Sequence, residues 1–166
     1  MTAARLYLAE LLGTFLFLTI GYTSVANFGA ATPAVTGLLV VPFSFGFGLL
    51  AAIFAFGHVS GGHFNPAVTI AMVADRRTTA IEGLGYIIAQ VIGAIGAAAV
   101  VLITINQDAV KAGITKPGPG VSDVGALILE TAFTAFFVIV ILIAADQIHR
   151  REERRLPALH HLAPSS

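Results

Sequence analysis

The stretch that decides the fold is His58-Val-Ser-Gly-Gly-His-Phe-Asn-Pro-Ala-Val-Thr69. Asn65 is a favoured helix N-cap and Pro66 a favoured first helical residue, so a helix is expected to begin there. Gly61 and Gly62 permit an extended or left-handed backbone just before the cap, which frees carbonyl groups to accept hydrogen bonds. The stretch therefore predicts a row of acceptors that leads to an amide donor at a helix N-terminus.

The segment from Gly57 to Asp75 surrounds this stretch and suits neither a crossing helix nor a solvated loop. It is too short and too interrupted by Gly and Pro to cross a bilayer, whereas residues 66–74 are too apolar for water. A re-entrant half-helix fits better, and irregular backbone at membrane depth is tolerated only where protein encloses it or a watery cavity lies beside it. The positive end of the helix dipole would repel cations and hydronium but admit neutral solutes. The alternative is that Asn-Pro merely begins a buried helix.

The composition places the rest of the chain in lipid. Of 166 residues, 57% are hydrophobic and 11% charged, and the mean hydropathy is +0.89. A bilayer core takes about 20 apolar residues of helix. Four stretches meet that length: Leu6 to Phe28, Gly37 to Phe56, Ile81 to Ile105, and Val124 to Ala145. The first could be mistaken for a signal peptide, but it is longer than a typical apolar signal core and no clean cleavage site follows, so we interpret it as a retained span.

The basic residues predict how these spans are oriented. Four crossings put both termini on one side of the membrane. Most of the basic residues fall on the same side as the termini, and that side is expected to be cytoplasmic. They are Arg5, Arg76, Arg77, Arg150, Arg151, Arg154 and Arg155, whereas only Lys111 and Lys116 fall on the opposite side. A net charge of zero gives no reason to expect nucleic acid as a partner. The absence of cysteine excludes thiolate catalysis and thiolate metal sites.

The first and fourth spans resemble each other. Glu10-Leu-Leu-Gly-Thr-Phe-Leu-Phe17 and Glu130-Thr-Ala-Phe-Thr-Ala-Phe-Phe137 share an acid, a hydroxyl and aromatic positions at an offset of 120 residues. Because the two spans lie an odd number of crossings apart, the copies run in opposite directions, as in the inverted repeats of membrane transport proteins. The third span carries small residues at four-residue spacing, which favours close helix packing, although such residues are also simply common in membrane helices. They are Gly85, Ala89, Gly93 and Ala97.

The stretch from His58 to Thr69 resembles the first Asn-Pro-Ala signature of the aquaporin, or major intrinsic protein, family, in its bacterial water-channel branch. Within the first span, the stretch from Ala9 to Phe15 is similar to that family's first-helix motif. Ala89-Gln90-Val-Ile-Gly-Ala94 is similar to its third-helix motif. The resemblance covers about residues 5 to 146. It implies an all-α polytopic membrane bundle of four transmembrane helices and one re-entrant half-helix, a partial aquaporin fold.

The resemblance also implies roles for individual residues. Asn65, with Pro66 and Ala67, would donate to water at the middle of the membrane. Phe45 matches the aromatic member of the outer selectivity constriction, where Phe is typical of the water-selective branch, although it could instead be a lipid-facing Phe. The remaining roles are pore carbonyls at Gly61, Gly62, His63 and Phe64, and support of re-entrant loops by Glu10, Gln90, Glu130 and His58.

The sequence departs from the family in its second half. The repeat offset carries Asn65 to position 185, beyond Ser166, so the second half-helix is not among these residues. Two inverted copies could complete each other, but the bias of basic residues favours one orientation. The expected domain covers residues 1–146, followed by a polar, amphiphilic or disordered cytoplasmic tail at 147–166. Truncation or a shifted reading frame would produce such a tail.

The expected function is that of a channel subunit for water or small neutral solutes, without cofactor, metal or enzymatic activity. The resemblance implies the lipid bilayer of the inner (plasma) membrane and a homotetramer. Glycerol or ammonia remain alternative solutes, and a nonconducting fragment or assembly partner is the alternative class. An enzyme would need a nucleophile with a base, or a metal cluster, and none has convincing spacing. His58 and His63 are five residues apart across glycines and are interpreted as loop supports rather than metal ligands, and His160 and His161 as solvated.

Overall fold

The computed structural model describes residues 2–29 and 34–160, and side chains at residues 2–29 and 36–147. The chain forms two compact units, residues 1–116 and residues 117–166, each of which is described by itself. Helices are the regular elements of both units in the described ranges. Four of these helices are long and apolar enough to cross a membrane, which confirms the all-helical fold and the four predicted spans.

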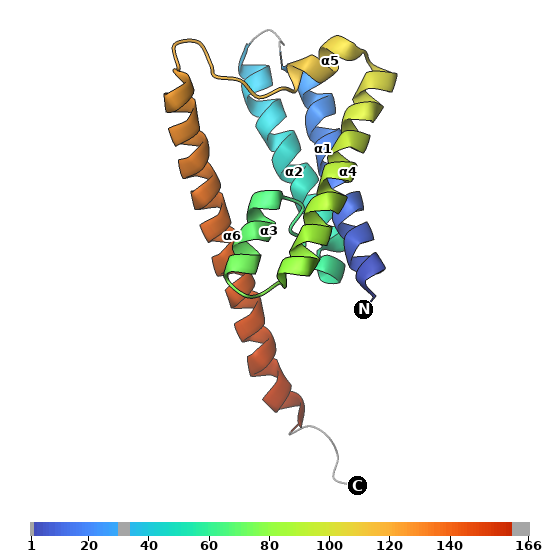
Figure 1. Cartoon of the computed structure of the whole chain (residues 1–166), viewed down its shortest axis with the longest axis vertical. Helices are drawn as coiled ribbons and strands as arrows, with labels where there is room; N and C mark the ends of the chain where they lie inside the picture. The colour runs from blue at the N-terminus through green and yellow to red at the C-terminus, as the bar shows by residue number, and fades with distance from the viewer. Residues whose placement is uncertain (1, 30–33, 161–166) are drawn as a thin grey trace. The chain divides into compact units, whose positions relative to one another are not determined.

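The first unit is built on three long helices that lie side by side (Figure 1). They are α1 (Ala3–Phe28), α2 (Ala34–Ser60) and α4 (Ala80–Thr104). α1 lies between the other two, antiparallel to α2 and parallel to α4 (Figure 1). Much of their surface is exposed apolar side chain, because lipid rather than water is the solvent that these helices meet.

Small residues let α4 approach α1 closely. Gly93 lies against the α1 backbone, where a Cβ would come 2.5 Å from the carbonyl oxygen of Leu11. One turn before and one turn after Gly93, Ala89 and Ala97 are buried in the same face. The predicted small-residue face of the third span is therefore a packing face, as expected where membrane helices pack by van der Waals contact.

The re-entrant element is α3 (Pro66–Ala74), which follows a five-residue loop (residues 61–65) after α2 and packs on α4. In this contact Gly83 faces Val73 and Thr69. A fifth helix, α5 (Gln107–Ala112), caps the far end of α1 and α4 (Figure 1). It was not predicted, although Asn106 caps it by accepting from the N–H of Ala109 at 2.9 Å.

The second unit contains α6 (Asp123–His160). Its apolar part, Asp123–Gln147, corresponds to the predicted fourth span. The helix continues through residue 160, so the predicted boundary after residue 146 is not marked by a break in the backbone. The last six residues of the predicted tail, 161–166, lie outside the described ranges.

Candidate functional site

The carboxylate of Glu10 is the centre of the site. Glu10 lies on α1, is fully buried, and accepts four hydrogen bonds. A carboxylate is an acceptor with two oxygens and about four lone-pair positions, so the four donors use its whole capacity. Oε1 accepts from the Ser60 hydroxyl (2.6 Å) and from the N–H of His63 (3.0 Å). Oε2 accepts from the N–H of Phe64 (2.7 Å) and from Nε2 of Gln90 (2.7 Å).

The backbone of the loop is shaped to present consecutive N–H groups to that carboxylate. Gly61 and Gly62 have φ angles of 90° and 70°, in the left-handed region that glycine adopts without steric cost. Phe64 also has a positive φ, 47°, which is uncommon for a bulky side chain and is held here by its N–H bond to Glu10 and by burial of its ring. The ring lies against Gly13, where a Cβ would overlap it.

A second group of hydrogen bonds ties the start of α3 to the loop and to α4. The Thr69 hydroxyl donates to the carbonyl of Asn65 (3.1 Å) and accepts from Nε2 of Gln90 (2.9 Å). Its remaining lone pair faces Nδ1 of His63 at 3.2 Å, so the network assigns the proton of that ring to Nδ1. Also from α4, the Tyr86 hydroxyl donates to the carbonyl of Ser60 at 2.7 Å.

Asn65 has one end of its amide fixed and the other free. Its Oδ1 accepts from the N–H of Ala67 at 2.8 Å, the bond expected of an N-cap, and Pro66 is the first helical residue. This bond assigns Oδ1 to the helix side, so Nδ2 is directed away from it, and no donor bond from Nδ2 is found among the described residues. Asn65 is half-buried. Its amide can therefore donate to an oxygen of a solute.

The carbonyl groups that precede Asn65 are also without partners. Within the described part of the chain, no hydrogen bond ends on the carbonyl oxygens of residues 61–64. A backbone carbonyl at membrane depth needs a partner, either protein or water. The loop thus combines unpaired acceptors with one unpaired amide donor, the combination that can replace the hydration of a small neutral solute.

Three other predicted residues make none of these hydrogen bonds. Phe45, on α2, packs edge-on against Tyr22 at a centroid distance of 6.1 Å and covers Gly21 of α1. His58 lies in the last turn of α2 and is exposed, and no hydrogen bond involving it is found among the described side chains. Glu130 lies on α6, in the second unit, and is exposed. Their roles in selectivity or support stay predictions.

Ser60, Thr69 and Tyr86 belong to the site but were not assigned a role from the sequence. Ser60 and Thr69 lie inside the stretch that was singled out, yet each meets a partner from a distant helix, Glu10 and Gln90 respectively. Tyr86 lies on the α4 face that also carries the predicted small residues, and its burial is the feature that sets it apart. In the described ranges, no three residues of the His, Cys, Asp and Glu types come together as a metal site.

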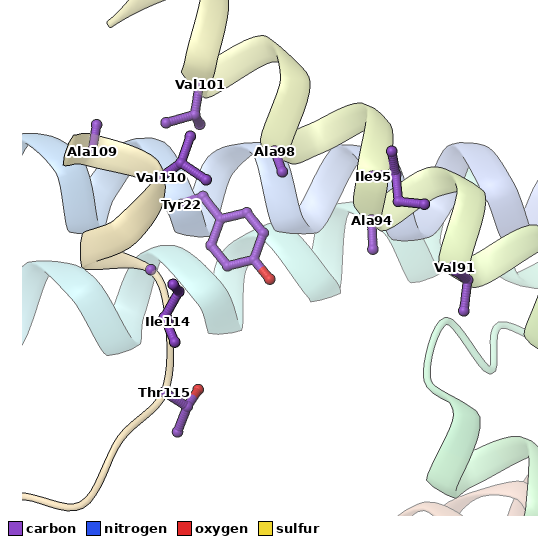
Figure 2. A pocket seen from close by; sticks show the side chains of 11 residues that line it. Tyr22, Val91, Ala94, Ile95, Ala98, Val101, Ala109, Val110, Ile114 and Thr115 are labelled. Carbon is purple, nitrogen blue, oxygen red and sulfur yellow. The ribbon is translucent and has the colours of Figure 1, made fainter. Parts of the chain in front are cut away.

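A separate pocket of about 470 Å³ opens between α1, α4 and α5 (Figure 2). Its walls are mainly apolar, with Ala94 and Ala98 of α4 on one side and Val110 of α5 on another. The Tyr22 ring projects into the space from α1 (Figure 2). Apart from the hydroxyl groups of Tyr22 and Thr115 the lining side chains carry no polar group, so the pocket offers volume rather than acid–base chemistry.

Comparison with known proteins agrees with this arrangement. The model of the major intrinsic protein family matches residues 1–162. The chain belongs to that family. The major intrinsic proteins are membrane channels and not enzymes, so this chain is a multi-pass membrane protein of a channel family.

The relatives of this major intrinsic protein include both aquaporins and a protein named after glycerol uptake. Aquaporin Z of Photorhabdus laumondii is 44% identical over 150 residues, which are 84% of this chain and 64% of that protein. Glycerol uptake facilitator protein-like 6 of Lactiplantibacillus plantarum is 38% identical over 147 residues, 87% of this chain and 65% of the relative. Mouse aquaporin-4 is 34% identical over 140 residues, 83% of this chain and 43% of the relative. The chain thus spans less than two thirds of the length of each.

Proposed function

We propose that this chain lines a channel that conducts water, with the Asn65 amide as the donor that each water molecule meets. The observation that carries the proposal is the orientation of that amide: Oδ1 is held by the N–H of Ala67, whereas Nδ2 has no partner among the described residues. An amide fixed in this way has already lost its rotational freedom and donates without reorganisation, so a passing water exchanges one hydrogen bond for another.

The carbonyl groups of the loop supply the complementary acceptors. Gly61, Gly62, His63 and Phe64 precede the helix terminus, and the N–H groups of His63 and Phe64 are occupied by Glu10. With these two donors occupied, the carbonyl oxygens are the groups of the loop that remain for a solute. The positive end of the α3 dipole beside Asn65 opposes cations, which favours neutral solutes. Phe45 is proposed to narrow the outer part of the path.

The experiment is a stopped-flow measurement of vesicle shrinkage after an osmotic jump. Liposomes with the 166-residue chain are compared with empty liposomes and with liposomes that contain the Asn65→Asp variant. Asp is as good an N-cap as Asn, so the variant keeps the bond to the Ala67 N–H while it loses the Nδ2 donor. We expect fast shrinkage for the unaltered chain and shrinkage at the rate of empty liposomes for the variant.

The chain offers a matched control at its other asparagine cap. Asn106 caps α5 through the N–H of Ala109, so Asn106→Asp makes the same chemical change at a helix that carries no part of the pore loop. Liposomes that contain this variant should shrink as fast as liposomes that contain the unaltered chain. If the unaltered chain is inserted and its liposomes shrink no faster than empty ones, autonomous conduction is wrong and the chain is a nonconducting member or an assembly partner.

Glycerol is a second candidate solute, favoured by the 38% identity with the glycerol uptake facilitator-like protein of Lactiplantibacillus plantarum. It is tested in the same vesicles by the reswelling that follows a glycerol gradient. Reswelling as fast as in vesicles of that relative would make glycerol the solute, whereas shrinkage without reswelling favours water. We further propose an inner (plasma) membrane location and cytoplasmic termini. The chain is also proposed to form a homotetramer, and cross-linking in native membranes tests that oligomeric state.

A further inference from the structure

The Phe45 ring has a seat on the backbone of α1 and an aromatic neighbour beside it. The ring lies on Gly21, where an added Cβ would overlap it, so no side chain stands between the ring and α1. A backbone surface of this kind does not by itself fix where a flat ring lies. In the described ranges, the ring that contacts Phe45 is Tyr22, at a centroid distance of 6.1 Å and an interplanar angle of 85°. This edge-to-face geometry is a favoured arrangement of two aromatic rings, so Tyr22 contributes to fixing the position of Phe45.

Tyr22 is itself in contact with α5. An added Cβ at Gly113, the C-cap of α5, would lie 3.2 Å from Cδ1 of the Tyr22 ring, so the ring lies close to the end of that helix. α5 is capped at its start by Asn106 and packs on both α1 and α4. A continuous set of contacts therefore runs from α5 through Tyr22 to Phe45.

The Tyr22 ring also borders open space. It projects into the cavity of about 470 Å³ that Ala94, Ala98 and Val110 help to line (Figure 2). Its hydroxyl group lies in that space, and no hydrogen bond of this hydroxyl is found in the described part of the chain. Because Tyr22 both contacts Phe45 and lines the cavity, removal of its ring would extend the cavity to Phe45. The Phe45 ring would then have room to turn away from its seat on Gly21.

We propose that Tyr22 determines specificity, because it holds the Phe45 ring where that ring narrows the outer part of the path. Pore selectivity depends on the diameter of the constriction, and a constriction keeps its diameter only where packing locks the side chain that forms it. With Phe45 held, water passes and wider neutral solutes such as glycerol are excluded. Tyr22 acts through Phe45 and is a positioning residue. The inference rests on the proposed function, but the position of Phe45 can be measured without conduction.

The first test measures the ratio of glycerol to water permeability in liposomes that contain the full chain or a variant. The helical signal of each variant verifies that it is folded. Tyr22→Ala should raise the ratio by roughly two- to tenfold, the change expected from the loss of one aromatic ring pair. Tyr22→Phe loses the hydroxyl but keeps the ring, so it should retain the ratio of the unaltered chain. Tyr22→Leu, the second variant, restores much of the volume without the ring and should give an intermediate ratio.

Val110→Ala is the matched control at the cavity. It enlarges the same cavity from α5 and leaves the pair of Tyr22 and Phe45 in place, so its permeability ratio should equal that of the unaltered chain. An equal rise for Val110→Ala and Tyr22→Ala would overturn the proposal, because cavity volume rather than the position of Phe45 would then set the ratio. A ratio for Tyr22→Ala that matches the unaltered chain would overturn it as well.

The second test observes the Phe45 ring directly, by fluorine NMR of a fluorinated phenylalanine incorporated at position 45 alone. We expect one narrow signal from the otherwise unaltered chain and from Tyr22→Phe, and a broadened or additional signal from Tyr22→Ala. The same signal from all three would contradict the positioning. If the signals differ as expected while liposomes of the unaltered chain conduct no water, the positioning holds and the proposed conduction fails. The two failures are therefore distinguishable.

Discussion

Glu10 organises the loop of residues 61–65 because its carboxylate is acceptor-only and fully buried. Each of its oxygens takes two donors: two of the four come from the loop and one from Ser60, the last residue of α2. Replacement by glutamine keeps the shape but turns one acceptor into an NH₂ group, which would face two of those donors. The same substitution at a carboxylate without such donors would change little.

For Glu10→Gln we therefore expect a loss of roughly 2–4 kcal/mol in the free energy of unfolding, because two buried donors lose their acceptor. The measurement is the midpoint of thermal unfolding in detergent micelles. Glu82→Gln, in the first turn of α4, is the control, because no hydrogen bond to its carboxylate is found among the described residues. It should cost only a few tenths of a kcal/mol through the helix dipole. Equal midpoints for the two variants would contradict the central role of Glu10.

A glycine on α1 controls the position of the Phe64 ring. We expect Gly13→Ala to displace the loop, because the added Cβ would overlap that ring, and to cost about 1–3 kcal/mol as overpacking does. Gly46→Ala in α2 is the control, since nothing lies within 4 Å of its added Cβ. There the substitution should stabilise the helix by up to about 1 kcal/mol. Unfolding midpoints in the same micelles rank the two, and a reversed order would refute the packing argument.

Among the elements, the contact of α1 with α4 depends on how closely two backbones approach. At Gly93 an added Cβ would lie 2.5 Å from the Leu11 carbonyl oxygen and 3.1 Å from the Phe15 N–H nitrogen, which are backbone atoms and cannot turn away. At Gly96 the nearest atom is Cδ2 of the Phe15 ring at 3.2 Å, and a side chain can yield. Two glycines one turn apart thus differ in what they permit.

Gly93→Ala should accordingly lower the free energy of unfolding by about 2 kcal/mol more than Gly96→Ala. The measurement is the loss of the helical signal as the fraction of sodium dodecyl sulfate in mixed micelles increases. Because both variants introduce the same methyl group into the same helix, intrinsic helix propensity cancels between them. A difference near zero would mean that α1 and α4 are not held at this distance in the membrane.

The elements differ in how far the sequence could predict them. Apolar length located α1, α2, α4 and the apolar part of α6, and the Asn65-Pro66 pair located the start of α3. The six residues of α5 were too few for a periodic pattern. The partners of Ser60 and Tyr86 could not be predicted either, because their bonds join residues 50 and 26 positions apart, and such pairs leave no local signal.

For the molecule as a whole, the distribution of basic residues predicts its orientation. Arg5 and the arginines of the loop after α3 fall on the side of both termini, and Lys111 and Lys116 on the other. The chain contains no cysteine, so single cysteines can report topology without background. Thr2 suits the inner position, because its side chain makes no cap bond to α1.

We expect a membrane-impermeant maleimide to label Lys116→Cys on intact cells and to leave Thr2→Cys unlabelled until the cells are permeabilised, since cytoplasmic loops carry the excess of Lys and Arg. Labelling after permeabilisation shows that both cysteines are reactive. The opposite pattern would contradict cytoplasmic termini, and labelling of both on intact cells would indicate that copies insert in two orientations.

The hydrogen bonds of Glu10 also set an order of events during synthesis. Its donors follow it in the chain by 50, 53, 54 and 80 residues. At about 5–20 residues per second, a ribosome needs roughly 4–16 s to make the last of them. α1, whose mean hydropathy of 1.5 is the lowest of the four spans, must therefore wait with an unsatisfied carboxylate. The carboxylate receives its full set of donors only after Gln90 has left the ribosome, which makes the nascent chain most vulnerable to quality control before α4 is complete.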